Sequence, residues 1–388
     1  MNSTSLLSHQ GGDLVRPRIF NHDIMNCTHE AVSGNYLYGG RALGLTEPAD
    51  IIQLHPDLSS EWPFITAHYE RIGLSHSQTA IWNVSRHRLT QFPICDISVF
   101  YFGDAMAAHS PTRDWFYHLD PQWCEVVEYV NCKNSFTQLA EILEIAIPKT
   151  MRFPSKAEIE RFDFLPYPCY VKPAVSVNGV GITRCQNELA LRQALLNIEE
   201  NVPLQVQQEI VASKFLNLQY QATEQGAERL AATEQILDGC AHLGNRYPTI
   251  HQPWELVDPM AHWMVNQGMK GIFAFDVAVV EQAGQTHYFA IECNPRFNGA
   301  SYPTGIARKL GISEWSNESF KTDHRSLSTI DLTGLEYDSS SGSGVIVVNW
   351  GSVLVGKLGI LIAGSVSEQQ VIRSHLQDRL KQRVLQEA

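Results

Sequence analysis

The sequence has little positive charge, and its basic residues do not gather into runs. Its 29 lysines and arginines are outnumbered by 41 aspartates and glutamates, which gives a formal net charge of -12. A protein that binds a nucleic-acid backbone usually has a basic face or basic runs that neutralise the phosphates. We therefore expect no nucleic-acid partner, although a local cationic pocket is compatible with this composition.

Paired cysteines and long apolar runs are also missing. The eight cysteines form no C-x-x-C pair and no regular spacing, which disfavours a structural zinc site or a disulfide scaffold. No stretch approaches the roughly 18 unbroken apolar residues of a membrane span, and the start lacks the pattern of a secretory signal. These absences predict a cytoplasmic protein with reduced thiols and no membrane partner.

What is present is the composition of a folded protein with room for two or three domains. Hydrophobic residues make up 44% and charged residues 18% of the 388 residues. Residues 1–35 are polar and aperiodic, so we expect a poorly ordered lead-in there. Alternating strand and helix patterns over 36–125 predict a small parallel α/β domain.

A second unit, 126–325, mixes helices with β-rich runs. The patterns predict a helix that begins near Lys133, a strand YPCYVKP that enters a glycine loop, and a hairpin formed by GIFAFDVAVV and THYFAIECN. Residues 213–232 support no assignment. The turn-rich DSSSGSG sets off the last segment, 326–388, which is expected to be a small α+β appendage.

The most specific chemical pattern lies near the ends of the two hairpin strands. Asp276 belongs to the first strand, and Glu292 and Asn294 lie two residues apart on the second, so these two share a face. Two carboxylates and an amide oxygen are hard oxygen ligands that suit Mg²⁺, and Arg296 just beyond them is suited to a phosphate or carboxylate. The alternative is a surface hairpin with two solvated acids, because short acidic motifs recur by chance.

Two lysines form the next pattern. Lys172 ends an apolar strand and precedes a loop with Gly179 and Gly181, whose backbone can approach a phosphate. Lys133 lies at the head of an amphipathic helix, where an anion is favoured. Taken singly, each has an ordinary alternative, a strand-to-turn glycine pair or an exposed lysine.

Polar residues beside these patterns are further candidates. Glu234 lies just before the glycine-punctuated DGCAHLGNRY and Arg246 lies within it. Irregular backbone of this kind lines pockets, so both residues are expected to contact substrate. Asn298, Ser301 and Tyr302 directly follow the second acidic strand and should lie beside a terminal phosphate and the acyl acceptor. For each of them a polar loop that caps the next helix is the alternative.

The order of lysine, lysine, glycine loop and Asp-Glu-Asn resembles the ATP-grasp superfamily. The resemblance implies an ATP-grasp fold, in which two α+β subdomains clasp ATP and two magnesium ions, with a lid subdomain at about 150–212. It implies that Lys133 and Lys172 bind the nucleotide. Arg296, Lys172 and Asn298 are expected to be catalytic, because they would lie beside the transferred phosphoryl group. It assigns the lid over the phosphates to Ser176, Asn178, Gly179 and Gly181. It assigns the adenine and ribose hinge to Gln207, Gln208 and Glu209, where two glutamines replace the usual acidic pattern.

A closer similarity is carried by NPRFNGASYPTGIARKLG, TEQILDGCAHLGNRYP and DIIQLHPD. These stretches resemble the pre-ATP-grasp peptide-ligase group, which includes the pheganomycin ligase, over about residues 45–388. The resemblance implies a pre-ATP-grasp domain at 36–125 that helps bind the electrophile, and a homodimer is common among such enzymes.

The expected activity is ligation of a small-molecule acid to an amine, an amino acid or peptide, through an acyl phosphate with release of ADP and phosphate. A phosphotransferase that uses the same nucleotide site and a non-catalytic nucleotide-binding module are the two alternatives.

Overall fold

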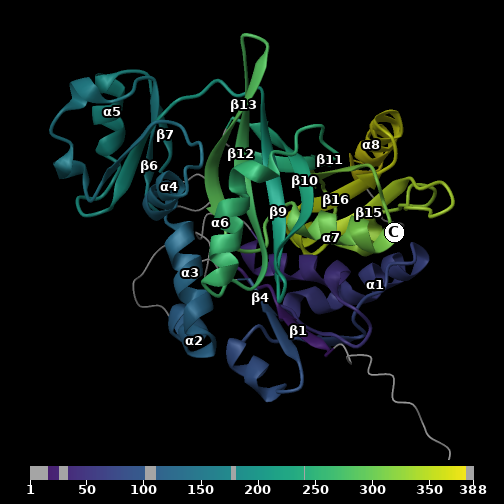
Figure 1. The fold of residues 1–388 in the computed structure, drawn as a ribbon. Coiled ribbons are helices and arrows are strands. Elements are labelled where there is room, and N and C mark those ends of the chain that lie inside the picture. Colours follow the sequence, from purple (N-terminus) through teal and green to yellow (C-terminus); the bar gives the residue numbers. More distant parts are fainter. Residues whose placement is uncertain (1–15, 26–33, 101–110, 176–180, 240, 382–388) are drawn as a thin grey trace, which may run out of the picture.

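The computed structural model describes residues 16–25, 34–100, 111–175, 181–239 and 241–381. It places them in three sheets with helices packed around them. The largest sheet has eight strands. In Figure 1 it lies at the centre, with a small antiparallel sheet to one side of it and a parallel sheet beneath it. Within the described ranges, no helix is long and apolar enough to cross a bilayer.

The first sheet is parallel and has the strand order β3-β2-β1-β4. Its strands are β1 (Arg18–Asn21), β2 (Ile51–Gln53), β3 (Thr79–Ile81) and β4 (Asp96–Val99). Parallel neighbours need crossover connections, and helical segments supply them here: η2 (Asn35–Leu45), α1 (Trp62–Arg71) and η4 (Arg86–Gln91). The predicted parallel layer is confirmed.

One expectation about this layer is wrong. β1 lies between β2 and β4 at the middle of the sheet, although residues 1–35 were expected to be a lead-in. Its four residues, RIFN, are too few to show a periodic pattern, and β1 is a strand only because two neighbours pair with it.

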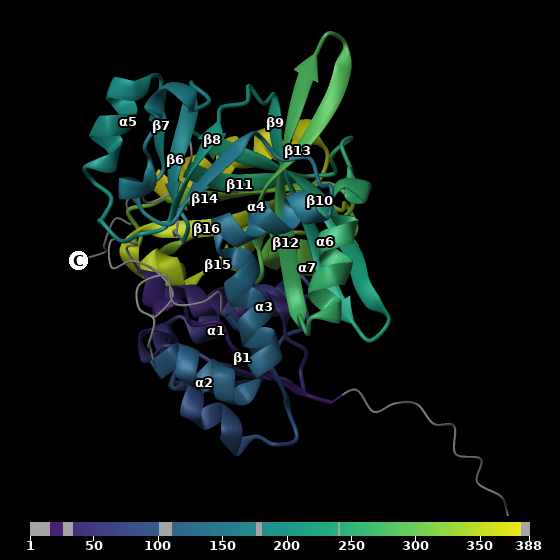
Figure 2. The ribbon, with the colours of Figure 1, turned by 60° about the vertical axis from the view of Figure 1, so that its left-hand side comes forward.

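The small antiparallel sheet has the order β5-β8-β6-β7. Its strands are β5 (Thr150–Phe153), β6 (Cys169–Pro173), β7 (Thr183–Cys185) and β8 (Leu204–Gln208). One face packs on α5 (Glu188–Leu195), with Val171 and Val206 in a common core with Leu191. Because strand residues alternate, the next residue, Lys172, points to the other face. There α4 (Lys133–Ile142) contacts both β8 and the central sheet (Figure 2).

The central sheet has the order β13-β12-β9-β10-β11-β14-β16-β15. Its strands are β9 (Lys214–Thr223), β10 (Gly226–Asp238), β11 (Ala241–Tyr247), β12 (Gly271–Gln282), β13 (Gln285–Asn294), β14 (Trp315–Lys321), β15 (Gly344–Asn349) and β16 (Lys357–Ala363). The predicted hairpin is therefore present as β12 and β13. The unassigned 213–232 contributes to two long strands, and the expected C-terminal appendage is instead continuous with the central sheet through β15 and β16.

The other helical segments cover the sheets and their connections. The α-helices are α2 (Pro111–Leu119), α3 (Pro121–Asn131), α6 (Trp254–Asn266), α7 (Ser301–Leu310) and α8 (Val366–Lys381). Short 3-10 turns are η3 (Pro56–Ser60), η5 (Lys156–Glu158), η6 (Phe162–Phe164), η7 (Leu327–Thr329) and η8 (Gly351–Val355).

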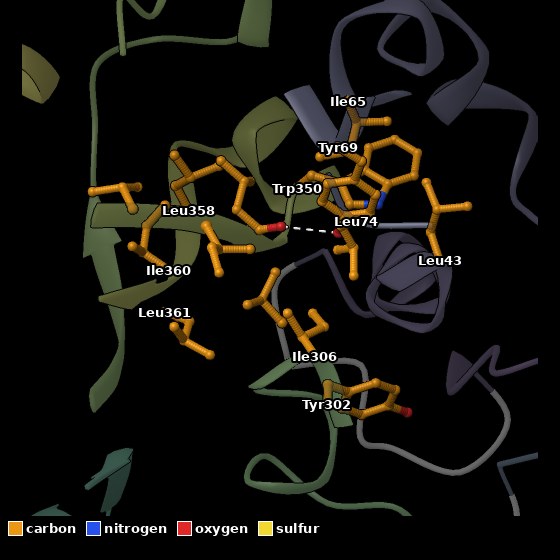
Figure 3. Close-up of a cluster of buried hydrophobic side chains, with 14 of the residues drawn as sticks. Leu43, Ile65, Tyr69, Leu74, Tyr302, Ile306, Trp350, Leu358, Ile360 and Leu361 are labelled. Atoms are coloured by element: carbon orange, nitrogen blue, oxygen red, sulfur yellow. Dashed lines mark hydrogen bonds between the residues drawn. The ribbon is translucent and has the colours of Figure 1, made fainter. Parts of the chain in front are cut away.

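One core joins the two ends of the chain. Figure 3 shows Tyr69 of α1, Ile306 of α7 and Trp350 side by side, although more than 200 residues separate the first from the others. The Tyr69 hydroxyl donates to the carbonyl of Val347 at 2.9 Å, and Trp350 Nε1 donates to the carbonyl of Gly40 at 2.7 Å. Buried polar groups that find partners in this way fix how the layers meet, so the parallel sheet is held against α7 and β15.

A buried histidine at the end of β1 predicts an acid-sensitive fold. Burial and nearby arginines lower the pKa of His22 to about 3, and its ring contacts Tyr302 Oη at 2.9 Å and Ser98 Oγ at 3.0 Å. The unfolded chain takes up a proton below its ordinary pKa of about 6.5 and the folded chain does not, so stability falls as pH falls. Between pH 7 and pH 5 we expect His22 to account for about 2 kcal/mol of lost unfolding free energy.

Urea unfolding of the wild type and His22→Gln at both pH values measures this contribution. The variant should lose correspondingly less stability than the wild type on acidification. His262→Gln, which changes an exposed histidine on α6, is the matched control and should behave like the wild type. An equal loss in the wild type and His22→Gln would contradict the assignment.

Candidate active site

Asp276 and Glu292 face each other across the β12–β13 hairpin because of a bulge. From the turn to Val277 the strands pair regularly, with Val277 opposite Ala290. One extra residue, Ile291, then enters β13, and Asp276 lies opposite Glu292. Without this residue Asp276 would lie opposite Ile291, and the two carboxylates would point to opposite faces of the sheet. The bulge therefore brings the two acids together.

Amide groups surround the first acid. Asn217 on β9 donates to Asp276 Oδ1 at 2.8 Å, and Gln235 on β10 donates to the same oxygen at 2.6 Å. Asn294 donates to Asp276 Oδ2 at 3.0 Å, so the predicted third ligand is in contact with the pair. Burial, followed by the negative charge of Glu292, raises the pKa of Asp276 to about 7. The paired carboxylates thus repel each other, and a cation between them would relieve that repulsion.

Two buried lysines balance the second acid. Lys133 Nζ lies 3.3 Å from Glu292 Oε2, and Lys133 is the first residue of α4. Burial acts to raise the pKa of Glu292, but the positive charges of Lys133 and Lys172 outweigh it and lower that pKa. Glu292 is therefore ionised at neutral pH, while burial and the charge of Glu292 raise the pKa of Asp276 on β12.

Lys172 reaches this region from the small sheet. Its side chain is 8% exposed, and Nζ donates to Gln207 Oε1 at 2.7 Å. Gln207 in turn donates to Thr150 Oγ1 at 2.9 Å. The β5-β8-β6 face thus carries a polar chain that holds one lysine, and the structure brings both predicted lysines toward Glu292 from two different elements.

The predicted hinge and lid residues do not gather around the acid pair as the two lysines do. Gln208 is exposed at the end of β8, and Glu209 forms a two-bond ion pair with Arg184, at 2.6 and 2.8 Å. Gly181, with φ at +80°, has the left-handed conformation that suits glycine. Three other predicted lid residues lie outside the described part of the chain: Ser176, Asn178 and Gly179.

Arg296 and Asn298 lie in the segment that directly follows β13. Arg296 Nη1 donates to Asn131 Oδ1 at 3.4 Å, and its guanidinium carbon lies 6.0 Å from the centre of the Phe100 ring. Asn298 donates to Asn217 Oδ1 at 3.4 Å, which links it to the amide cluster. Its own Oδ1 accepts the backbone N–H groups of Ala300 and Ser301, so this residue both borders the acid pair and fixes the turn that leads into α7.

Ser301 and Tyr302 are buried at the start of α7, with 1% and 0% exposure. The hydroxyl of Tyr302 meets His22, and the guanidinium of Arg41 lies 4.4 Å from the centre of its ring. Tyr302 thus contributes to the packing between α7 and the parallel sheet, a structural role that the sequence did not indicate. Ser301 instead bonds through Oγ to Asn298 in the turn before α7.

Glu234 and Arg246 are not brought to the acid pair. Glu234 lies opposite Leu216, which belongs to the hydrophobic core, whereas the next residue, Asn217, points to Asp276. Register partners share a face, so Glu234 and its partner Arg246 point away from the cluster. Glu234 pairs instead with Lys214 at 2.7 Å. Strand alternation therefore separates these two predicted residues from the site.

The sequence prediction missed Asn217 and Gln235. A signal for the first was present, because Leu216, Leu218 and Tyr220 alternate with polar residues, the period-two pattern of a strand with one buried face. That alternation would have placed Asn217 opposite the core and toward the site. Gln235 has no comparable signal, because a register shift along β10 alters which residues face the acid pair.

The donor set fits Mg²⁺ bound together with phosphates. In the described ranges no cluster of three His, Cys, Asp or Glu is present, so the chain contributes two carboxylates and the Asn294 amide. Mg²⁺ usually takes one or two carboxylates and completes its shell with waters and phosphate oxygens. The closely paired acids and the two lysines on the opposite side therefore suit a magnesium–polyphosphate ligand.

Comparison with known proteins gives a family match to part of the chain. Residues 139–300 match the family model described as an ATP-grasp domain. This range contains Lys172 and all three predicted metal ligands, and begins six residues after Lys133. No curated protein matches the sequence.

Solved structures with the same architecture cover most of the chain at low identity. N5-carboxyaminoimidazole synthetase from Staphylococcus aureus, complexed with ADP, has a TM-score of 0.55 at 13% identity, over 87% of this chain and 94% of that one. Carboxyaminoimidazole ribonucleotide synthase from Aspergillus clavatus, complexed with ATP, has a TM-score of 0.55 at 10% identity, over 94% and 98%. Biotin carboxylase from Campylobacter jejuni, in a β,γ-ATP complex, has a TM-score of 0.57 at 12% identity, over 88% of both chains.

Proposed function

Because the chain has an ATP-grasp fold, we propose that it is an ATP-dependent ligase that joins a carboxylate to an amine through an acyl phosphate. One observation carries this proposal. The bulge in β13 places Asp276 and Glu292 on one face of the sheet, and two buried lysines approach the same point from α4 and β6. An acid pair beside an amine pair suits a magnesium-bound triphosphate.

The lysines would hold the nucleotide. Lys133 and Lys172 are both more than nine-tenths buried, which strengthens their attraction for phosphate oxygens. A phosphate that reached Lys133 would take the place now held by Glu292, and that carboxylate would be released toward the metal. Mg²⁺ held by Asp276, Glu292 and Asn294 would neutralise charge that develops on the transferred phosphoryl group.

Arg296 and Asn298 would act on the transferred group. The substrate carboxylate attacks the γ-phosphate, the bond to the β-phosphate oxygen breaks, and ADP leaves. Arg296 stabilises the phosphoryl group, and the acyl phosphate then loses phosphate to an attacking amine. The side chain of Cys293 takes no part, because it faces the core with its Sγ 3.8 Å from Met264 Sδ, and burial raises the pKa of its thiol.

At a finer level, we propose amino acids or peptides as substrates. The support is the resemblance of segments on both sides of the acid hairpin to the pre-ATP-grasp peptide ligases. Two structural neighbours are named for carboxyaminoimidazole products, so bicarbonate belongs among the acids to be tested.

The direct test incubates the full chain with ATP, Mg²⁺ and pairs of acids and amines, bicarbonate included. ADP, inorganic phosphate and the mass of any product are measured together. The proposal expects ADP and phosphate in equal amounts and a product with one new carbon–nitrogen bond. AMP with pyrophosphate would reject it, and so would ADP with phosphate retained on the second substrate, the result expected of a phosphotransferase.

A further inference from the structure

A cavity of about 490 Å³ opens at the carboxyl ends of three parallel strands in the first sheet. Asp23 follows β1, His55 follows β2, and a loop from Trp82 to His87 follows β3; all of them line it. Ligands of open α/β sheets bind at the carboxyl ends of parallel strands, since the loops there diverge and leave a crevice. This cavity is separate from the acid pair and lies in a layer whose first strand the sequence did not predict.

A buried amide network shapes the cavity wall. Asn21 donates from Nδ2 to Gln53 Oε1 at 2.8 Å and to the carbonyl of Val84 at 2.9 Å. Gln53 donates to the carbonyl of Ser85 at 3.3 Å. Asn21 and Gln53 are 0% and 1% exposed, so the ends of β1 and β2 hold the loop after β3 in a fixed position. The cavity is therefore preformed.

Two buried charges of opposite sign line this fixed wall. Asp23 is 3% exposed and Arg86 is 8% exposed. Asp23 Oδ1 accepts a long bond, 3.5 Å, from the backbone N–H of Met25, and no cation in the described ranges forms an ion pair with this carboxylate. Arg86 donates to the backbone carbonyl of Asp23 at 3.4 Å. A buried carboxylate without an ion-pair partner is costly, and a ligand cation would lower that cost.

Aromatic surface completes the cavity. Trp82 and Trp115 both line it, and each is only partly buried. Trp82 is fixed edge-on against Trp62, with 5.6 Å between ring centres. Indole rings offer a large apolar face at little entropic cost, and they suit an apolar or aromatic side chain.

The residue before Asp23 contacts the segment that follows β13. His22 immediately precedes Asp23, and its ring lies 4.5 Å from that of Phe297, the residue after Arg296. The segment that carries Asp23 is thus in contact with the segment that carries Arg296.

We propose that this cavity binds the amine substrate as an α-amino acid with an apolar or aromatic side chain. Its ammonium lies at Asp23, its carboxylate at Arg86, and its side chain against Trp82 and Trp115. The opposite charges of Asp23 and Arg86 match the zwitterion, and the tryptophans match the side chain. The role of the bound amino acid as the amine substrate rests on the proposed ligase function. The binding itself is inferred from the cavity alone.

Binding of three related probes to the full chain tests the assignment by calorimetry. L-phenylalanine has both charges, phenethylamine lacks the carboxylate, and N-acetyl-L-phenylalanine lacks the ammonium. Removal of either charge should weaken binding by about tenfold or more, the usual scale for a charged hydrogen bond. Equal binding of all three probes, or of none, would overturn the assignment without any substitution in the protein.

Substitutions then locate the two charges. Asp23→Asn should remove the preference for L-phenylalanine over its N-acetyl form, and Arg86→Gln should remove the preference over phenethylamine. Matched controls are Asp96→Asn, an exposed acid at the start of β4, and Arg88→Gln, an exposed arginine on the same turn as Arg86. The two controls should keep both preferences. Loss of a preference in a control would reject the placement of the ammonium at Asp23 and the carboxylate at Arg86. A folded Asp23→Asn or Arg86→Gln variant that keeps its preference would reject it as well.

Hydroxylamine separates this inference from the ligase proposal. It attacks acyl phosphates without an amino-acid site, so Asp23→Asn should form hydroxamate at the wild-type rate while its KM for the amino acid rises about tenfold or more. Loss of hydroxamate in Asp23→Asn would show that the cavity holds the acid and would overturn the inference. If the wild type forms no ADP with any acid, the ligase proposal fails, and the three-probe binding result still decides the cavity.

Discussion

Replacing Glu292 by glutamine should abolish ATP turnover while the fold stays intact. The two side chains have nearly the same shape, but glutamine cannot supply the charge that now pairs with Lys133 and that a divalent cation requires. Loss of a preorganised electrostatic contact of this kind costs about 10²–10³-fold in kcat. ADP release by the variant, measured with saturating ATP and Mg²⁺, should fall by at least this factor.

Glu281→Gln is the matched control for this experiment. Glu281 lies on the same hairpin, is exposed, and bonds only to Thr286 among the described contacts, at 3.1 Å. It should retain wild-type turnover and a similar melting temperature. Wild-type turnover in Glu292→Gln would reject the assignment of the acid pair to magnesium and nucleotide.

The hairpin illustrates how far sequence reasoning reached. Two β-rich runs separated by a glycine-containing turn predicted β12 and β13, and the spacing of Glu292 and Asn294 predicted their common face. The position of Asp276 relative to them depends on the bulge at Ile291, which inverts the facing of every residue beyond it. The two acids are neighbours, as predicted. In a regular hairpin without the bulge, however, their side chains would point to opposite faces of the sheet.

Site residues contributed by distant strands could not be predicted from local sequence patterns. Asn217 and Gln235 belong to β9 and β10, and they meet Asp276 only because β9 pairs with β12 in one register. That register depends on contacts far apart in the chain, which local patterns do not encode. The prediction that Glu234 contacts substrate has the same weakness. Successive residues of β10 point to opposite faces of the sheet, so Gln235 faces the acid pair and Glu234 faces away from it.

The parallel sheet shows a second limit. β1 has four residues, and its position between β2 and β4 comes from pairing with strands about 30 and 80 residues away, as the partners Ile19–Ile51 and Ile19–Ile97 show. Local pattern therefore left Asp23 in a segment that was expected to be a poorly ordered lead-in. Once β1 is paired, its carboxyl end necessarily lies beside those of β2 and β3, where the cavity opens.

The contacts of the site also explain why nucleotide binding should reorganise it. Glu292 is now held by Lys133, and Asp276 by three amides, so each acid has protein partners where a cation would bind. Phosphate oxygens are the natural competitors for the lysines. Binding of a nucleotide with its metal thus exchanges one set of charge pairs for another and leaves few groups unpaired.

Substitution of Lys172 by methionine should weaken ATP and ADP binding by roughly 10–100-fold, which corresponds to the 1.5–3 kcal/mol of a hydrogen bond to a charged group. Methionine keeps the length of the buried stem but cannot donate, so Gln207 Oε1 also loses its partner. Fluorescent-nucleotide displacement measures the affinity. Lys270→Met, which changes a lysine whose side chain is 63% exposed, is the control and should bind like the wild type. Unchanged affinity in a folded Lys172→Met variant would remove the phosphate contact from the proposal and leave Lys133 as its remaining lysine.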